Sequence, residues 1–333
     1  MNDQQSLLVA DIGGTNARFA IAHRDRPGFS SVATLGTADF ESVEAAIDAY
    51  LARECLANPA AICIAAAGPV AGRRVQLTNG PWLVSSDTLA GHFGADQVRL
   101  LNDFEAVAYA MPFLAEKDLC AVGGSAPHRP GAGDFTIGIV GPGTGFGAAG
   151  LVRRDGVLVP IAGEAGHAGF TPETPEQLEV LKALHEVYDR VVIEHLLSGP
   201  GIVNLNRALG RVRGVPPSAD TAARIFTKGA GDDALAADTV ALFFEVLGQV
   251  AGDLALILGA RDGMYVAGGI VPRYQDLLKA SGFRRAFENK GPYRALMETI
   301  PTTLVTHPEP GLLGASACVH DLAGQGRVSG PML

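Results

Sequence analysis

Two short glycine turns in matching contexts are the first candidates for chemistry in this sequence. One, Asp11-Ile-Gly-Gly-Thr15, follows the apolar run 6–10, and the other, Gly141-Pro-Gly-Thr144-Gly145, follows the apolar run 135–140. Adjacent glycines let the backbone approach an anion closely, and successive N–H groups can form an anion-binding concavity without a lysine. The pair therefore indicates a polyphosphate site, although either turn alone could be an ordinary tight hairpin.

An acidic residue directly precedes the first of these turns. Asp11 ends the apolar run that leads into Gly13 and Gly14. Mg²⁺ bound with phosphates keeps several waters and takes few carboxylates. We therefore expect Asp11 to hold Mg²⁺ through water.

A second group of polar residues suits a neutral, hydroxyl-rich ligand. Asn102 and Asp103 close an apolar run, where side chains can project from the carboxyl edge of a sheet. Glu164 and His167 lie in the glycine-rich segment 160–172. Together they offer the hydrogen-bond acceptors and donors that a polyol needs. Two plainer interpretations stay open, with Asp103 as a helix N-cap and His167 as an ordinary loop histidine.

Several familiar catalytic motifs are absent or incomplete. No lysine follows a glycine, so the Walker-type phosphate loop cannot occur. His23-Arg-Asp25 and Asp103-Phe104 imitate parts of a protein kinase but lack the Asn and Gly that complete those motifs. The segment 143–148 fits a loose dinucleotide fingerprint, yet the sequence continues as a strand where that fingerprint needs a helix. No H-E-x-x-H and no C-x-x-C occurs, which disfavours a dedicated zinc site.

The elements that position these residues are strands alternating with helices. Each glycine turn joins two apolar runs, which predicts two strand–turn–strand hairpins and a duplicated structural unit, unless the match is coincidence in a glycine-rich chain. Near-continuous apolar runs at 61–67 and 98–101 predict buried strands. Apolar residues spaced by three and four over 240–258 predict a long core helix. The pattern is that of an α/β protein.

Composition limits the possible partners and location. The chain has 333 residues, 47% of them hydrophobic and 18% charged, with a formal net charge of −9. This balance supports a large core and argues against binding to nucleic acid or to an anionic membrane surface. The N-terminus lacks the features of a signal peptide, and the four cysteines form no close pair. We expect a soluble, cytoplasmic protein.

Eight motifs in one order make the chain similar to the bacterial glucokinases that lack zinc. They span about residues 6–320 and are Asp11-Ile-Gly-Gly-Thr-Asn-Ala-Arg18, Thr78-Asn-Gly-Pro-Trp82, Asn102-Asp-Phe104, Gly141-x-Gly-Thr-Gly145, Gly163-Glu-Ala-Gly-His167, Ser198-Gly-Pro-Gly201, Ala267-Gly-Gly-Ile-Val-Pro-Arg273 and Gly311-Leu-Leu-Gly314. The resemblance implies a two-lobed actin-like ATPase (ribonuclease H-like) fold, with a duplicated core and a cleft between lobes. It places residues 1–113 and 307–333 in a small α/β domain and 114–306 in a large one. The activity it implies is MgATP-dependent phosphorylation of the 6-hydroxyl of glucose by a homodimer.

The resemblance also implies a role for individual residues. Asp103 resembles the base on the 6-hydroxyl, and the other sugar contacts would be Asn102, Glu164, His167 and, by a one-residue shift in spacing, Glu186. The first phosphate loop would comprise Gly13, Gly14, Thr15 and Asn16, and the second Gly143, Thr144 and Gly145. Gly268 and Gly269 resemble the adenosine wall, and the large domain would carry both the adenosine site and the second loop.

Three alternatives share part of this pattern. A kinase for another hexose or hexosamine would keep the chemistry and change only pocket contacts. A sugar-responsive regulator would normally carry a helix-turn-helix before the fold, and only five residues precede Ser6 here. An actin-like ATPase would have no use for Asn102, Asp103, Glu164 and His167 together.

Overall fold

The chain forms two compact units. The structure, a computed structural model, describes residues 6–78, 80–124 and 126–325, so Asn79 of one family motif lies outside the described residues. Unit 1 comprises residues 1–114 and 307–333, and unit 2 comprises 115–306. These limits differ by one residue from the domain limits expected at 113/114.

Unit 1 contains a five-stranded sheet in the order β3-β2-β1-β4-β8. Its strands are β1 (Leu7–Ile12), β2 (Asn16–Ala22), β3 (Phe29–Gly36), β4 (Ala61–Ala66) and β8 (Gln97–Asn102). The first three strands are antiparallel neighbours, whereas β1, β4 and β8 run parallel. A small separate sheet joins β5 (Val70–Ala71), β6 (Arg74–Gln76) and β7 (Leu83–Ser85). The carboxyl ends of β1 and β8, where Asp11 and Asn102 lie, are therefore on one edge of the same sheet.

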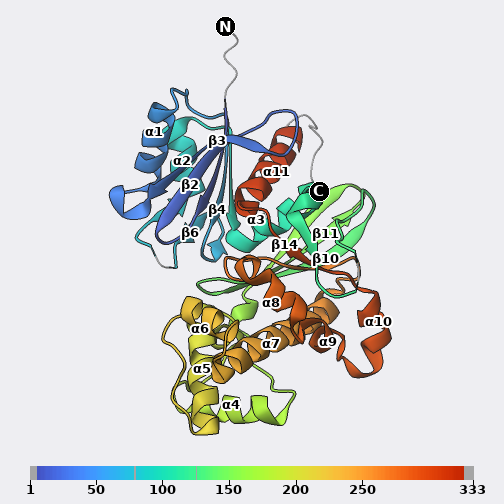
Figure 1. Cartoon of the computed structure of the whole chain (residues 1–333). Helices are drawn as coiled ribbons and strands as arrows, with labels where there is room; N and C mark the ends of the chain where they lie inside the picture. The colour runs from blue at the N-terminus through green and yellow to red at the C-terminus, as the bar shows by residue number, and fades with distance from the viewer. Residues whose placement is uncertain (1–5, 79, 125, 326–333) are drawn as a thin grey trace. The chain divides into compact units, whose positions relative to one another are not determined.

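Helices cover both faces of the unit 1 sheet (Figure 1). They are α1 (Val43–Arg53), α2 (Ser86–Phe93), α3 (Asp103–Ala110) and α11 (Pro310–Gln325), with 3₁₀ turns η1 (Thr37–Asp39) and η2 (Met111–Phe113). α1 and α2 pack on the face that carries Leu8, Ala10 and Ile12. On the other face, α11 contacts both α3 and β1. The C-terminal helix thus supports both strands that lead to the polar residues.

Unit 2 contains a six-stranded sheet in the order β12-β11-β10-β13-β14-β9. Its strands are β9 (Leu119–Ala121), β10 (Phe135–Pro142), β11 (Phe146–Arg154), β12 (Val157–Gly163), β13 (Met264–Val266) and β14 (Thr302–Val305). β10, β11 and β12 are antiparallel, and β10, β13 and β14 run parallel. Leaving β9 aside, this is the strand order of unit 1. The predicted duplication is therefore confirmed, with one glycine turn in each hairpin.

The helices of unit 2 enclose an aromatic and aliphatic core. They are α4 (Pro175–His185), α5 (Gly199–Arg213), α6 (Ala222–Gly229), α7 (Ala234–Leu258), α8 (Gln275–Ala280), α9 (Phe283–Glu288) and α10 (Arg294–Thr299), with 3₁₀ turns η3 (Glu116–Asp118), η4 (Ala165–His167), η5 (Ile193–His195), η6 (Val271–Tyr274) and η7 (Gly291–Tyr293). By length and composition α7 could cross a membrane, but 67% of its most apolar window is buried in the protein. It is the long core helix that the 240–258 spacing predicts.

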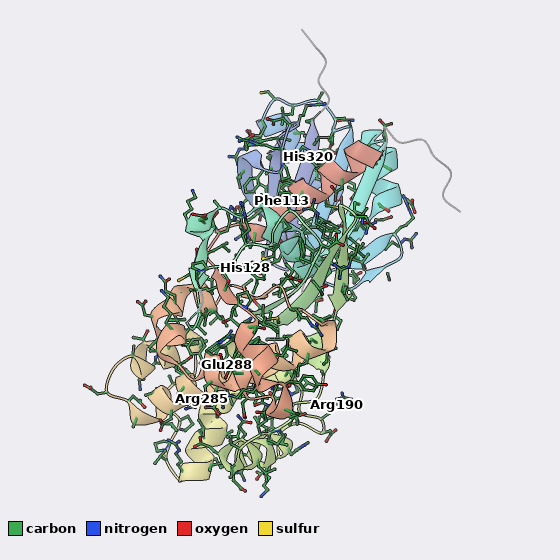
Figure 2. All side chains as sticks on the ribbon, turned by 90° about the vertical axis from the view of Figure 1, so that its right-hand side faces the viewer. Phe113, His128, Arg190, Arg285, Glu288 and His320 are labelled. Carbon is green, nitrogen blue, oxygen red and sulfur yellow. The ribbon has the colours of Figure 1, made fainter. Side chains whose placement is uncertain are left out.

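One ion pair joins α9 to α7, and another lies within α9. Arg285 Nη2 lies 3.0 Å from Glu245 of α7, and Arg284 Nε lies 2.5 Å from Glu288. Figure 2 labels Arg285 and Glu288 on this helix. Within unit 2, Tyr265 of β13 donates its hydroxyl to the carbonyl of His128, 3.1 Å away. Of these contacts, the hydroxyl of Tyr265 joins β13 to the segment that precedes β10.

The contact between α3 and α11 gives the first testable prediction. A Cβ on Gly314 would overlap the carbonyl oxygen of Ala106 and lie 3.1 Å from the amide nitrogen of Ala110. Gly314→Ala must push the two helices apart, so we expect the free energy of unfolding to fall by about 1–3 kcal/mol, measured by urea denaturation.

The control is the same substitution inside α2. A Cβ on Gly91 meets nothing within 4 Å. Gly91→Ala should therefore be neutral or stabilising by up to about 1 kcal/mol, because alanine favours the helix. Equal stability changes in the two variants would contradict the close helix contact.

Candidate active site

The first glycine turn connects β1 to β2 in unit 1. The amide of Gly13 donates to the carbonyl of Asn16, at 2.9 Å, which closes the turn around Gly14 and Thr15. Thr15 and Asn16 are exposed, while the two glycines are partly buried. The turn therefore presents backbone to solvent between two buried strands, as an anion-binding loop requires.

Asp11 lies beside this turn in a negatively charged environment. It is the cross-strand neighbour of Arg18, whose Nε lies 3.2 Å from Glu309. Burial first, and then the nearby charge of Asp103, raise the pKa of Asp11 to about 6, against the lowering effect of Arg18. The structure thus brings Asp11 and Asp103 together, although 91 residues separate them in the sequence.

The start of α11 also packs against Asp11. A Cβ on Gly311 would lie 2.8 Å from the carboxylate oxygen Oδ2 of Asp11. Only glycine leaves room for the carboxylate at this place. The positive end of the α11 dipole lies at this point and partly stabilises the negative charge of the Asp11 carboxylate.

Asn102 and Asp103 lie where β8 ends and α3 begins. The N-cap of α3 is Asn102, whose Oδ1 accepts the amide of Phe104 at 2.8 Å, while Glu105 accepts the amide of Asn102 at 2.8 Å. Asn102 Nδ2 also donates to the carbonyl of Gly68, at 3.2 Å. Asp103 is the first helical residue, so the plainer interpretation of Asp103 as the N-cap was wrong. The capping position belongs to its neighbour because the chain turns one residue earlier.

The second glycine turn connects β10 to β11 in unit 2. The amide of Gly143 donates to the carbonyl of Gly145 at 2.8 Å, and the carbonyl of Gly143 accepts the amide of Gly199 at 2.9 Å. Gly199 is the first residue of α5, which follows Ser198. The start of α5 therefore holds the turn from behind and leaves the exposed Thr144 at its tip.

The turn that carries Glu164 and His167 packs on β11. Both side chains are exposed, Glu164 at the N-cap of η4 and His167 at its last residue, while Gly166 between them is buried. A Cβ on Gly166 would lie 2.6 Å from the carbonyl oxygen of Phe146. Because Phe146 directly follows the second glycine turn, the structure places the Glu164–His167 turn next to that turn.

Gly268 and Gly269 follow β13 and adjoin the same turn. Gly268 has φ +87°, and a Cβ there would lie 2.5 Å from the carbonyl oxygen of Pro142. The amide nitrogen of Gly269 lies 4.0 Å from the position of a Cβ on Gly143. Glycine is required at 268 by both the backbone conformation and the close approach.

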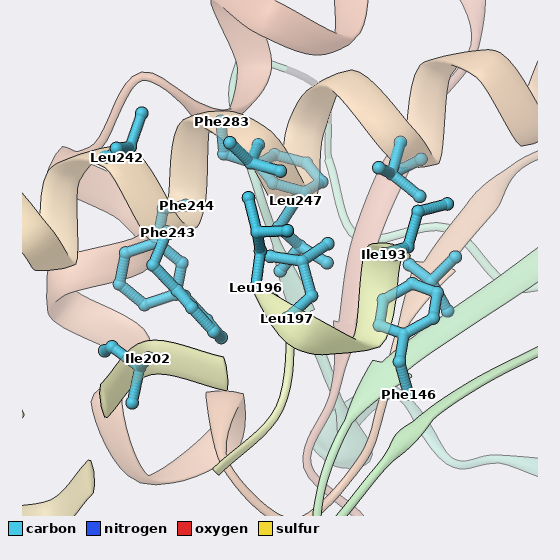
Figure 3. Packing of buried hydrophobic residues seen from close by; sticks show 14 of the residues in the cluster. Phe146, Ile193, Leu196, Leu197, Ile202, Leu242, Phe243, Phe244, Leu247 and Phe283 are labelled. Atoms are coloured by element: carbon cyan, nitrogen blue, oxygen red, sulfur yellow. The ribbon is translucent and has the colours of Figure 1, made fainter. Parts of the chain in front are cut away.

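Glu194 is a site residue that the sequence reasoning missed. Its Oε2 accepts the amide of Phe146 at 2.8 Å and lies 3.5 Å from the position of a Cβ on Gly166. It belongs to η5, which Figure 3 shows with Ile193 beside Phe146 and with Leu196 and Leu197 near α7. Glu194 thus touches both the second glycine turn and the Glu164–His167 turn.

Two aromatic rings and an amide fix the position of η5. His195 stacks on Tyr188 with ring centroids 3.9 Å apart, and Asn204 Nδ2 donates both to the Tyr188 hydroxyl and to the His195 carbonyl, each at 3.1 Å. Burial lowers the pKa of His195, outweighing the raising effect of Glu194. A neutral His195 can accept the amide of Val192 through Nδ1, at 3.4 Å.

The structure gives Glu186 no such position. It is an exposed residue at the C-terminal cap of α4, paired with Arg211 of α5. Glu194 lies four residues before Ser198 of the Ser-Gly-Pro-Gly motif, but the spacing alone does not distinguish it from Glu186.

The carboxylates near Asp11 fit a Mg²⁺ ion whose other ligands are water and phosphate oxygens. Within residues 6–78, 80–124 and 126–325, no three His, Cys, Asp or Glu side chains converge as a metal site. The charges of Asp103 and Glu309 nevertheless both raise the pKa of Asp11, whereas Arg18, which pairs with Glu309, lowers it. This excess of negative charge suits a hydrated cation that receives its other ligands from phosphate.

Comparisons with known proteins agree over nearly the whole chain. The Glucokinase family model matches residues 8–322. A glucokinase of Caulobacter sp. (strain K31) is 42% identical over 314 residues, which cover 94% of each chain. The crystal structure of a glucokinase from an Antarctic psychrotroph aligns with a TM-score of 0.86 and 35% identity, covering 95% of this chain and 99% of that one. A glucokinase from Balamuthia mandrillaris, solved in complex with glucose, shares the fold with a TM-score of 0.78 and 22% identity over 95% of this chain and 94% of that one. The expected actin-like ATPase fold is confirmed.

The raised pKa of Asp11 gives the second testable prediction. Its folded value of about 6 exceeds the ordinary 3.8, so ionising Asp11 costs folding free energy fully above about pH 6 and not at all below about pH 4. Asp11→Asn should therefore stabilise the protein at about pH 8 by on the order of 2 kcal/mol, and the gain should vanish toward pH 4.

Urea denaturation of parent and variant across this pH range measures the effect. Asp25→Asn, at an exposed aspartate, is the control and should leave the pH dependence of the parent unchanged. A stability gain of Asp11→Asn that is the same at every pH would contradict the assignment of the cost to ionisation.

Proposed function

Because the chain belongs to the glucokinase family, we propose that it transfers the γ-phosphoryl group of ATP to the 6-hydroxyl of glucose, giving glucose 6-phosphate and ADP. The observation that carries this proposal is the approach of Asp103 to Asp11 at one edge of the unit 1 sheet. This arrangement places a basic oxygen near the proposed phosphate turn, at the same edge of one sheet. A protein that only binds nucleotide has no need of the second carboxylate.

Asp103 is the proposed general base. Phosphoryl transfer has a loose transition state, so the protein acts mainly by positioning the reactants and stabilising charge. Asp103 would accept the proton of the 6-hydroxyl as that oxygen attacks. Its place at the first residue of α3, fixed by the Asn102 cap, holds the carboxylate at the end of β8.

The proposed sugar contacts are polar side chains at the end of β8 and on the turn around η4. The Asn102 side chain uses one amide hydrogen for the carbonyl of Gly68 and one oxygen lone pair for the amide of Phe104, so a second hydrogen and a second lone pair can serve the sugar. The side chains of Glu164 and His167 are exposed and accessible to a ligand. We replace Glu186 by Glu194 as the remaining contact. A carboxylate that already accepts one backbone amide can accept a sugar hydroxyl with its other lone pairs.

The proposed nucleotide contacts are the two glycine turns. Amides of Gly13–Asn16 and of Gly143–Gly145 would face the phosphates, and Gly268 with Gly269 would lie along the adenosine. Asp11 would hold Mg²⁺ through water, and the ion when bound supplies charge neutralisation on the phosphates. Exclusion of water from the reacting groups prevents hydrolysis from competing with transfer to the sugar.

We also propose that the protein works as a cytoplasmic homodimer, as the family resemblance implies. Burial of most of α7 within unit 2 supports a soluble chain. Light scattering on the purified protein determines the oligomeric state.

Asp103→Asn is the third testable prediction. The amide keeps the shape of the side chain but loses the basic oxygen, so kcat should fall by roughly 10²–10⁴-fold. Glucose and MgATP should still bind within several-fold of the parent, as measured by calorimetry. Because Asn102 and not Asp103 caps α3, the melting temperature should change little. Turnover within tenfold of the parent, after deamidation has been excluded by mass spectrometry, would show that Asp103 is not the base.

The fourth prediction compares two glutamates with one substitution. Glu194→Gln keeps an acceptor for the Phe146 amide but weakens hydrogen bonds from sugar hydroxyls, so the KM for glucose should rise about 10-fold or more, since a bond to a charged group contributes about 1.5–3 kcal/mol. The KM for MgATP should change little.

Glu186→Gln is the matched comparison. It removes only an exposed ion pair with Arg211, so both KM values should stay within about twofold of the parent. A rise in glucose KM at Glu186 but not at Glu194 would restore the original assignment.

A further inference from the structure

A buried threonine holds the first glycine turn from behind. Thr37 begins η1, directly after β3, and only 2% of it is exposed. Its Oγ1 donates to the carbonyl of Gly14 at 2.7 Å, and its amide donates to the carbonyl of Thr15 at 3.0 Å. One residue thus engages two successive carbonyls of a turn that is more than twenty positions away in the sequence.

These two bonds decide which way the turn's amides face. In a trans peptide the carbonyl and the N–H of the next residue point in opposite directions. The described residues contain no cis peptide. With the carbonyls of Gly14 and Thr15 directed at Thr37, the amides of Thr15 and Asn16 must point away from it. That is the orientation in which a turn offers donors to an anion.

The second turn is held by the same principle with a different donor. There the carbonyl of Gly143 accepts the backbone amide of Gly199 at the start of α5. A side-chain substitution cannot remove a backbone donor, but it can remove the hydroxyl of Thr37. The first turn therefore allows a test of whether a donor behind the turn orients its peptide.

We propose that Thr37 is a positioning residue for nucleotide phosphates. Its hydroxyl keeps the Gly14–Thr15 peptide in the orientation that presents the Thr15 amide to phosphate oxygens. Without the hydroxyl, the peptide can rotate and turn a carbonyl toward the same oxygens, which repels them. The inference rests on the proposed function of the Gly13–Asn16 turn as a phosphate site, and it adds a residue that never touches the nucleotide.

Thr37→Ser and Thr37→Ala form the matched pair that tests this role. Both lose the same buried methyl group, and they differ only in the hydroxyl. The probes are MgADP and glucose, each titrated separately by calorimetry, together with the melting temperature without ligand. We expect Thr37→Ser to bind MgADP within about threefold of the parent and Thr37→Ala about tenfold more weakly, the equivalent of one hydrogen bond. Glucose should bind both variants within about twofold of the parent.

A third variant guards against a general loss of structure. Thr37→Val keeps the shape of the side chain without the hydroxyl, so it should match Thr37→Ala in MgADP binding even if its melting temperature differs. Equal MgADP affinity in the Ser and Ala variants would overturn the positioning role, as would affinities that follow melting temperature instead of the hydroxyl. Failure of the parent itself to bind MgADP would overturn the proposed function and this inference with it.

Discussion

The poorly solvated carboxylate of Asp11 at the end of β1 is the constraint on which the other features of unit 1 depend. Asp11 is partly enclosed by its own sheet, and among the described residues the charges of Asp103 and Glu309 oppose its ionisation while that of Arg18 favours it. Ionising it costs folding free energy, as the raised pKa records. The fold tolerates that cost through a cross-strand arginine and a helix start. A cation bound beside Asp11 would stabilise the ionised carboxylate.

Close backbone approach is the second constraint, and glycine is what permits it. At Gly166 the Glu164–His167 turn lies directly against the carbonyl of Phe146, and at Gly314 α11 lies against α3. Either approach is impossible with a Cβ. Both contacts connect an element carrying polar residues to the rest of its unit. The high glycine content of the chain is therefore partly a packing requirement, beyond its use in the two glycine turns.

Rigid support distinguishes the two glutamates that compete for one role. Glu194 lies on a short 3₁₀ turn whose aliphatic neighbours are buried against α7, and whose end is held by Tyr188 and Asn204. Glu186 lies on an exposed helix end. A carboxylate that must meet a sugar hydroxyl at a fixed distance needs the first kind of support. Spacing along the chain is a poor guide here, because a short loop between α4 and η5 can change length without moving either element.

The sequence by itself determined the α/β class, the duplicated hairpins and the position of the long core helix. These follow from local rules, since periodicity, apolar runs and glycine turns act over a few residues. It also singled out Asp11, Asn102 and Asp103, because polar residues at strand ends are visible in the pattern. The tertiary structure alone decided that Asp11 lies near Asp103, that Glu194 adjoins the second turn, and that Thr37 anchors the first. Each of these depends on contacts between distant segments, which arise only when strands pair and helices pack, and no local pattern specifies them.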